Sequence, residues 1–165
     1  PFAMWLRFLL LTSLTSNALG APPLEELVSN GGQRMLKAWN GKYMSLNIRF
    51  AKWNFSSRIW FLVAVELGTQ HMNPQWIIEK RSDTQVSLKF ALYPKQSLYL
   101  QDSWWDGAAF SDGKVDTWEL WTPVKNEDGS WSFRSHKGRW LSAHEYDADM
   151  MDENKGCEQF WIEEW

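Results

Sequence analysis

After residue 32, short hydrophobic runs alternate with polar turns along the chain. The runs are rich in aromatic and β-branched side chains, which is typical of β-strands. Gly follows Asn, Asp or Lys between several runs, and Gly adopts the positive φ of tight turns at no steric cost. No stretch here has the spacing of a capped amphipathic helix. The pattern predicts strands at Arg34–Trp39, Lys42–Asn47, Ile59–Glu66, Gln75–Lys80, Val86–Tyr93, Ser97–Asp102, Thr117–Val124, Ser130–Ser135, Arg139–His144 and Gln159–Glu164.

These strands recur in three similar units. The units begin near Arg34, Ser87 and Ser132, and each has a strand, a turn and a second strand. Hairpin-rich units that cannot bury their apolar faces separately can close around a pseudo-threefold axis. We therefore predict an all-β domain with a single β-trefoil. Another small β-barrel is the alternative, because Gln75–Lys80 has the place of an insertion in a minimal trefoil. The expected closing strands of the units are Ile59–Leu62, Thr117–Leu120 and Gln159–Ile162.

The third unit, residues 132–163, resembles the repeat of fascin-like β-trefoil domains. The resemblance rests on the Gly hairpin in Phe133–Ala143 and on the aromatic closing strand in Cys157–Glu163, and it is weaker in the other units. It implies a trefoil fold. Fascins are cytoplasmic actin bundlers with four tandem trefoils, so we expect no actin binding from a chain with one. The Gln-x-Trp motif of ricin-type lectins occurs once, at Gln159–Trp161.

The N-terminal segment is typical of a secretory signal peptide. Arg7 precedes the apolar run Phe8–Leu14, which is far shorter than the roughly 20 residues of a membrane span. Ala18 and Gly20 provide small side chains for cleavage after Gly20. We therefore predict a secreted, extracellular protein without a membrane span. Its parts are a signal peptide at 1–20, whose start can also lie at Met4, an N-terminal lead at 21–32 and a β-trefoil domain at 33–165.

The composition limits the possible sources of stability of this domain and its possible partners. One cysteine, Cys157, rules out intramolecular disulfides, so aromatic side chains have to supply the packing. Twelve of the 13 tryptophans follow the predicted signal peptide. We expect Cys157 to be a small buried side chain, with intermolecular pairing as the alternative. The net charge of −3 argues against nucleic acid as a partner. Basic residues that could meet an acidic glycan, or simply face solvent on strands, are Arg34, Lys37, Lys42, Arg49, Lys52 and Arg58.

Two adjacent tryptophans, Trp104 and Trp105, are the candidate ligand-binding residues. Neighbouring side chains of an extended segment point to opposite faces, so we expect at least one ring to be exposed. Asp102 and Asp106 lie beside them and could bond hydroxyl groups of a sugar. In the alternative interpretation, the loop folds back and both rings cover the open end of the barrel.

An acidic stretch offers weak candidates for calcium, namely Asp147, Asp149, Asp152 and Glu153. Their spacing differs from an EF-hand loop, and a solvated hairpin loop explains them better, so we expect no metal and no cofactor. No His, Cys or Ser has the context of a catalytic nucleophile or base, and we expect a protein that is not an enzyme. Carboxylates such as Asp116 and Glu119 could still be brought together by the fold.

Asn54 begins an Asn-Phe-Ser sequon in a polar stretch between predicted strands. We predict N-glycosylation there if the protein passes through a eukaryotic secretory pathway. Taken together, these features favour a secreted, non-enzymatic binding module, most plausibly for carbohydrate. The alternatives are a structural protein of the extracellular matrix, including a mineralised one, and a secreted inhibitor or toxin. Expected partners are glycans or matrix components.

Overall fold

The computed structural model describes residues 24–28, 32–49, 62–68, 74–91, 97–103, 107–145 and 147–165. Its strands fall into three units of four. Unit 1 contains β1 (Arg34–Ala38), β2 (Tyr43–Arg49), β3 (Leu62–Gly68) and β4 (Trp76–Lys80). Unit 2 contains β5 (Val86–Phe90), β6 (Leu98–Asp102), β7 (Ala108–Asp112) and β8 (Trp121–Lys125). Unit 3 contains β9 (Trp131–Ser135), β10 (Trp140–Ala143), β11 (Ala148–Met151) and β12 (Phe160–Glu164).

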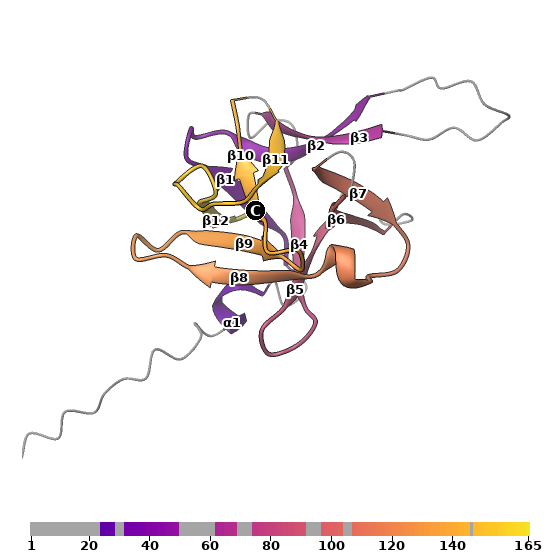
Figure 1. The fold of residues 1–165 in the computed structure, drawn as a ribbon, viewed down its shortest axis with the longest axis horizontal. Helices are drawn as coiled ribbons and strands as arrows, with labels where there is room; N and C mark the ends of the chain where they lie inside the picture. Colours follow the sequence, from indigo (N-terminus) through magenta and orange to yellow (C-terminus); the bar gives the residue numbers. More distant parts are fainter. Residues whose placement is uncertain are drawn as a thin grey trace, which may run out of the picture.

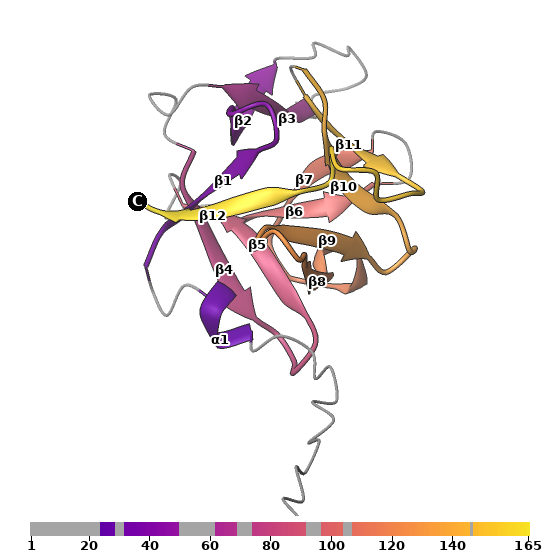
Figure 2. The ribbon, with the colours of Figure 1, turned by 90° about the vertical axis from the view of Figure 1, so that its left-hand side faces the viewer.

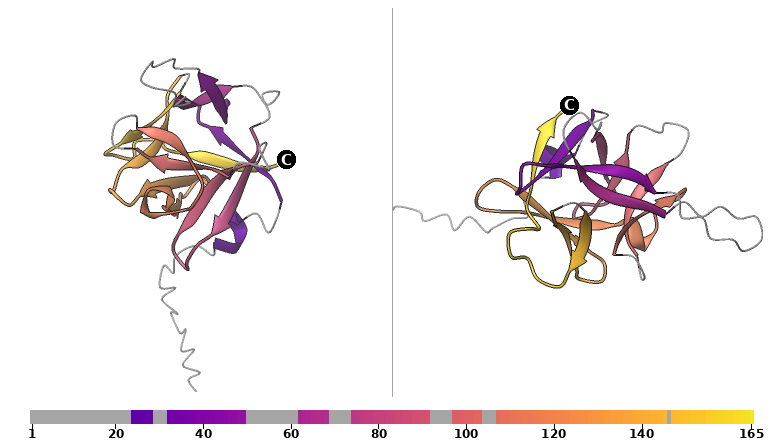
Figure 3. Two further views of the ribbon diagram at one scale, coloured as in Figure 1. Left: turned by 90° about the vertical axis from the view of Figure 1, so that its right-hand side faces the viewer. Right: turned by 90° about the horizontal axis from the view of Figure 1, so that it is seen from above.

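The first and fourth strands of the units form a closed barrel. Antiparallel pairs link β1 to β4, β4 to β5, β5 to β8, β8 to β9, β9 to β12 and β12 back to β1. The closing pair lies side by side in Figures 2 and 3. The second and third strands form one hairpin in each unit: β2–β3, β6–β7 and β10–β11. This arrangement is a β-trefoil, and it confirms the predicted fold.

The core repeats with the same pseudo-threefold symmetry. Leu36, Leu88 and Phe133 are fully buried at the middle of the first strands. The corresponding layer on the second strands is Met44, Leu100 and Leu141, and on the fourth strands it is Trp76, Trp121 and Phe160. Burying one such side chain contributes roughly 1.5–3 kcal/mol, so packing can stabilise the fold without disulfides. Cys157 is half-buried and carries no disulfide.

A short helix, α1 (Leu24–Leu27), precedes the barrel. It lies at the end opposite the β2–β3 hairpin in Figure 1. Leu24 and Leu27 are buried in the same core as the strands, so this part of the predicted lead packs on the domain. Within the described residues, no helix is long and apolar enough to cross a membrane.

Several predicted strand assignments need correction. Two strands, β7 and β11, were not expected, because one is Ala-rich and the other lies in the acidic stretch. The start of the predicted strand Thr117–Val124 is instead a 3₁₀ helix, η2 (Thr117–Glu119), capped by Asp116. The predicted insertion Gln75–Lys80 supplies β4, the true closing strand of unit 1. The expected closing strand Ile59–Leu62 only reaches β3 at Leu62, and its first three residues lie outside the described part.

Candidate functional site

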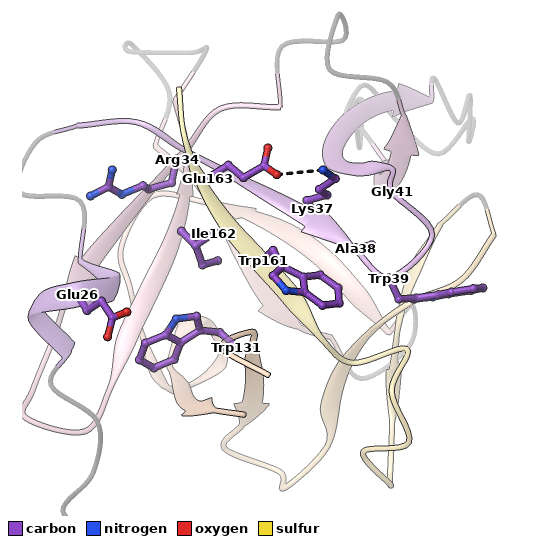
Figure 4. Close-up of a pocket in the computed structure, with 11 residues that line it drawn as sticks. Glu26, Arg34, Lys37, Ala38, Trp39, Gly41, Trp131, Trp161, Ile162 and Glu163 are labelled. Carbon is purple, nitrogen blue, oxygen red and sulfur yellow. Dashed lines mark hydrogen bonds and ion pairs between the residues drawn. The ribbon is translucent and has the colours of Figure 1, made fainter. Parts of the chain in front are cut away.

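A groove of about 550 Å³ lies over the outer face of the pair that closes the barrel, β1 and β12 (Figure 4). It brings together residues from both ends of the chain and from the turn between β1 and β2. The lining residues are Glu26, Arg34, Lys37, Ala38, Trp39, Gly41, Gly129, Trp131, Trp161, Ile162 and Glu163.

Strand register places three of the groove's neighbours in one row. Lys37 of β1 is opposite Trp161 of β12 on one side and opposite Tyr43 of β2 on the other. Opposite residues of antiparallel strands share a face of the sheet, and so do residues two apart on one strand. Glu163 therefore joins Trp161 on this face. The row exists because the last strand pairs with the first.

The polar centre of the groove is a carboxylate with two donors. Lys37 Nζ lies 3.0 Å from Glu163 Oε1, and the Tyr43 hydroxyl donates a hydrogen bond of 2.9 Å to Glu163 Oε2. Burial raises the pKa of Glu163, but the hydrogen bonds from Lys37 and Tyr43 outweigh it, so the pKa is lowered. The same bonds raise the pKa values of Lys37 and Tyr43. The carboxylate is thus ionised and the ammonium protonated at neutral pH.

Indole rings form the apolar part of the groove. The indole ring of Trp39 is held in place because the Trp39 Nε1–H donates a 2.7 Å hydrogen bond to the carbonyl of Ala143. Trp39 nevertheless remains 52% exposed, whereas Trp131 is only 3% exposed. In the view of Figure 4, the half-buried Trp161 lies between them. Gly41 lets the chain turn back after Trp39 with a φ of 76°.

The remaining charged side chains at the groove have partners of opposite charge. Arg34 pairs with Glu164 at 2.8 Å, and Glu26 pairs with Lys125. Lys42, another member of the predicted basic cluster, donates to the carbonyl of Glu145. Arg34, Lys37 and Lys42 therefore do not form a uniformly basic patch. The side chain of Arg49, like Lys52 and Arg58, lies outside the described part of the structure.

This arrangement can bind a small neutral molecule with one apolar face and several hydroxyl groups. An exposed indole offers a flat apolar surface, and Glu163 still has lone pairs beyond those that Lys37 and Tyr43 occupy. Lys37 has three N–H donors, of which the ion pair uses one. Charged groups make stronger hydrogen bonds to hydroxyls than neutral groups do.

The structure puts the predicted site residue Asp102 in the interior. Its side chain is fully buried, and its Oδ2 accepts a 2.5 Å hydrogen bond from the Ser135 hydroxyl. Arg139 also pairs with its carboxylate, and Lys137 donates to its backbone carbonyl at 3.1 Å. Asp102 thus ties β6 to the β9–β10 hairpin and is not at the surface. Trp104, Trp105 and Asp106 lie outside the described residues, as do Asn54 and residues 1–20.

The acidic stretch contributes a strand instead of the expected solvated loop. Asp147 and Asp149 lie at exposed positions at and in β11, and Asp149 accepts a hydrogen bond from the amide of Met150. Asp152 is exposed, and Glu153 pairs with Lys155. Among the residues that the structure describes, no group of three or more His, Cys, Asp or Glu side chains could hold a metal ion.

The carboxylates of Asp116 and Glu119 do come together, but in a capping box. Asp116 accepts from the amide of Thr117 at 2.7 Å, while Glu119 accepts from the amide of Asp116 at 2.8 Å. Both side chains are occupied with the N-terminus of η2. Their proximity is therefore explained by local structure.

Sequence reasoning did not find the groove. Trp161 and Glu163 are spaced two apart in a predicted strand, and Lys37 was counted among the basic residues. The alternation signals that Trp161 and Glu163 share a face. Nothing local signals that this face adjoins Lys37, because the two strands are far apart in the sequence and meet only when the barrel closes.

Comparisons with known proteins agree with the fold. No protein-family model matches the sequence, and no curated protein matches it. The designed threefold-symmetric protein ThreeFoil is similar over 81% of this chain and 99% of its own, with 16% identity and a TM-score of 0.63. SeviL, solved bound to asialo-GM1 saccharide, is similar over 81% of this chain and 97% of its own, with 13% identity and a TM-score of 0.59.

A mosquitocidal holotoxin is also similar, over 84% of this chain, with 15% identity and a TM-score of 0.64. This chain covers only 18% of the holotoxin. At these identities the likenesses establish a shared β-trefoil fold.

Proposed function

We propose that the groove over β1 and β12 is a carbohydrate-binding site and that this protein is a non-enzymatic glycan-binding module. The proposal rests on one observation: two indoles, Trp39 and Trp161, line the same groove as the Lys37–Glu163 ion pair. Sugars present an apolar C–H face that packs on aromatic rings, and hydroxyls that bond to charged groups. The volume of about 550 Å³ falls within the range of small-molecule sites.

The comparison with SeviL adds a limited kind of support. SeviL was solved bound to a saccharide, so a saccharide site can be built on this fold. The sequences are too different for residue roles to be transferred between them. The fascin-like resemblance of residues 132–163 likewise supports the fold, and we propose no actin binding from it.

Binding to a glycan array tests the proposal. The intact mature chain should bind at least one oligosaccharide, and Trp161→Ala should lower the affinity about tenfold or more, which is about 1.4 kcal/mol. Trp165→Ala is the matched control, because Trp165 is 51% exposed and does not line the groove. A variant with both Trp104→Ala and Trp105→Ala tests the other candidate site, the loop that the sequence predicts. If that variant alone loses binding, the glycan binds at the loop and not in the groove.

If the array shows no binding to any glycan, the proposal is wrong. The matrix hypothesis would then lead, since it needs the tryptophans only for packing. Calorimetric titration with collagen and with hydroxyapatite particles would test that hypothesis directly.

We also propose that the protein is secreted, on the basis of residues 1–20. N-terminal sequencing of protein collected from the medium of expressing cells should begin at Ala21 or Pro22. Glycosidase treatment of the same material should increase gel mobility if Asn54 carries a glycan. Protein retained in the cell with residues 1–20 attached would contradict the proposal.

A further inference from the structure

The row of side chains at the groove has a counterpart in each of the other two units. In face 1 the row is Trp161, Lys37 and Tyr43, from β12, β1 and β2. In face 2, from β4, β5 and β6, the same register gives Ile77, Lys89 and Tyr99. In face 3, from β8, β9 and β10, it gives Thr122, Arg134 and Trp140.

The centre of each row is the same interaction. The cation of Lys37 lies 5.7 Å from the ring centroid of Tyr43, and that of Lys89 lies 5.9 Å from Tyr99. In face 3 the Arg134 guanidinium lies 5.5 Å from the ring of Trp140. A cation over an aromatic ring is thus a shared element of the three units and stabilises each sheet. By itself it does not distinguish a binding face.

Of the three indoles that line the groove, the two that solvent can reach, Trp39 and Trp161, are at positions that the other faces fill with other residues. Trp161 is replaced at the same register by Ile77 in face 2 and by Thr122 in face 3. Trp39, two residues after Lys37, corresponds to Ala91 after Lys89 and to His136 after Arg134. Neither Ile nor Thr offers a flat ring on which a sugar can pack. Among the residues that the structure describes, face 1 is therefore the one with an indole at both register positions. Face 3 has the imidazole of His136, edge-on to Trp118, at the place of Trp39.

In face 2, an arginine of the same face occupies the polar groups that a ligand would need. Arg81 lies 5.6 Å from the Tyr99 ring centroid and donates to the Tyr99 hydroxyl at 3.4 Å. It also pairs with Glu79, the counterpart of Glu163. The hydroxyl and carboxylate that Tyr43 and Glu163 present in face 1 are thus engaged by an arginine in face 2.

Face 3 lacks the carboxylate. Val124 holds the place of Glu163, opposite Ser132, just as Glu163 is opposite Met35. Arg134 points its Nε at the carbonyl of Gly138, at 3.0 Å, across its own hairpin. A sugar hydroxyl would find no acceptor at this position equivalent to Glu163.

We infer that only face 1 binds glycan, so that of three equivalent faces the domain uses one and takes up one oligosaccharide. This inference rests on the proposed function. It distinguishes the protein from a cross-linker, because a monomer with a single site cannot bridge two glycan-bearing surfaces. The pseudo-threefold fold serves as a scaffold for one site.

Native mass spectrometry counts bound oligosaccharides and tests the inference. The probes are asialo-GM1 saccharide and the oligosaccharide with the strongest array signal. Wild-type protein should saturate at one adduct, and Trp161→Ala should remove it. Trp39→Ala, in the turn, provides a second test should Trp161→Ala fail to fold. Ile77→Ala and Thr122→Ala are matched controls at the same register and should retain one adduct.

The outcomes separate the inference from the proposed function. A second saturable adduct that disappears in Ile77→Ala, Thr122→Ala or Tyr99→Ala would overturn the inference and leave glycan binding intact. An adduct that survives changes in all three faces would overturn the inference and the placement of the site in the groove. No adduct with any oligosaccharide would overturn the proposed glycan binding itself. Beads coated with the bound oligosaccharide should carry the protein without clumping, and clumping by monomeric protein would also contradict a single site.

Discussion

Trp76 and Trp121 occupy equivalent positions in two units and make the same hydrogen bond. Each is fully buried on a fourth strand, and each donates its indole Nε1–H to the backbone carbonyl of a second-strand residue. The bond reaches Met44 at 2.8 Å in unit 1 and Leu100 at 3.0 Å in unit 2. Unit 3 has Phe160 in this position, which fills the space without a donor.

Replacing Trp121 with Phe should therefore keep the fold but weaken it. The variant loses the bond to Leu100 and part of the buried ring, and we expect the free energy of unfolding to fall by about 2–4 kcal/mol. Urea denaturation followed by circular dichroism measures the change. Trp165→Phe is the control and should leave the midpoint unchanged, because Trp165 is half exposed. Equal losses in both variants would show that neither the buried hydrogen bond nor the buried ring of Trp121 causes the change.

Gly107 should be less replaceable than Gly129, although both have positive φ, at 64° and 85°. A Cβ at Gly107 would overlap Asp149 Oδ1 and lie 3.0 Å from its Cγ, whereas a Cβ at Gly129 meets nothing within 4 Å. Both Ala variants carry the backbone strain of about 1–2 kcal/mol. We expect Gly107→Ala to lose about 1 kcal/mol more than Gly129→Ala in thermal unfolding. Adding Asp149→Ala should recover that difference, and no recovery would show that Asp149 is not the cause.

Asp102 should be a stability residue and not a ligand contact. Removing its carboxylate leaves Arg139 without its buried partner, and Asp102→Ala should lower the free energy of unfolding by about 3 kcal/mol. Asp83→Ala is a matched control, since Asp83 also pairs with a lysine but is 98% exposed. Glycan affinity of the folded fraction should be unchanged in both variants. A folded Asp102→Ala protein of normal stability that has lost glycan binding would restore the role expected from the sequence.

The Glu163 carboxylate should make the free energy of unfolding depend on pH in the acidic range. Its pKa is lowered in the folded protein, so its contribution is fully present above its ordinary value of 4.5 and is lost as pH falls through the folded pKa. Wild-type stability should thus fall more steeply below about pH 4.5 than that of Glu163→Gln. Urea midpoints between pH 2 and 7 measure both, and parallel curves would contradict the assignment.

The same groups predict how glycan binding responds to pH. Between neutral pH and the ordinary value of 4.5 for a glutamate, Glu163 stays ionised and Lys37 protonated, so affinity should be constant. Below that range the carboxylate loses its acceptor capacity, and affinity should decline. Calorimetric titration of the glycan identified on the array measures this. In Glu163→Gln the affinity should be low at neutral pH and insensitive to acid.

Local patterns predicted most of the fold. Short aromatic runs and Gly turns gave the strand segments, and their recurrence gave three units and the trefoil. The patterns failed where a strand had little β-propensity, as in Ala108–Asp112, or lay in charged sequence, as in Ala148–Met151. In Ala148–Met151 the buried and exposed positions do alternate, but two buried residues, Ala148 and Met150, in an otherwise acidic stretch are too weak a signal.

The site depended on contacts that no local pattern contains. Adjacent acidic and aromatic residues in the sequence favoured Asp102 as a ligand contact, yet the carboxylate is used by Ser135 and Arg139 from the next unit. Likewise, the polar partners of Glu163 are Lys37 and Tyr43, which are more than 100 residues away in the sequence.

The sequence by itself determined the all-β class, the three units and the reliance on tryptophan in place of disulfides, because strand period, turn residues and composition are local properties. Only the tertiary structure decided that β12 closes the barrel on β1, which of the aromatic residues are buried, and that one face of three has two indoles beside a carboxylate. Pairing between the ends of a chain depends on how the whole barrel closes. That closure depends on contacts between residues far apart in the sequence, and the local spacing of residues does not predict them.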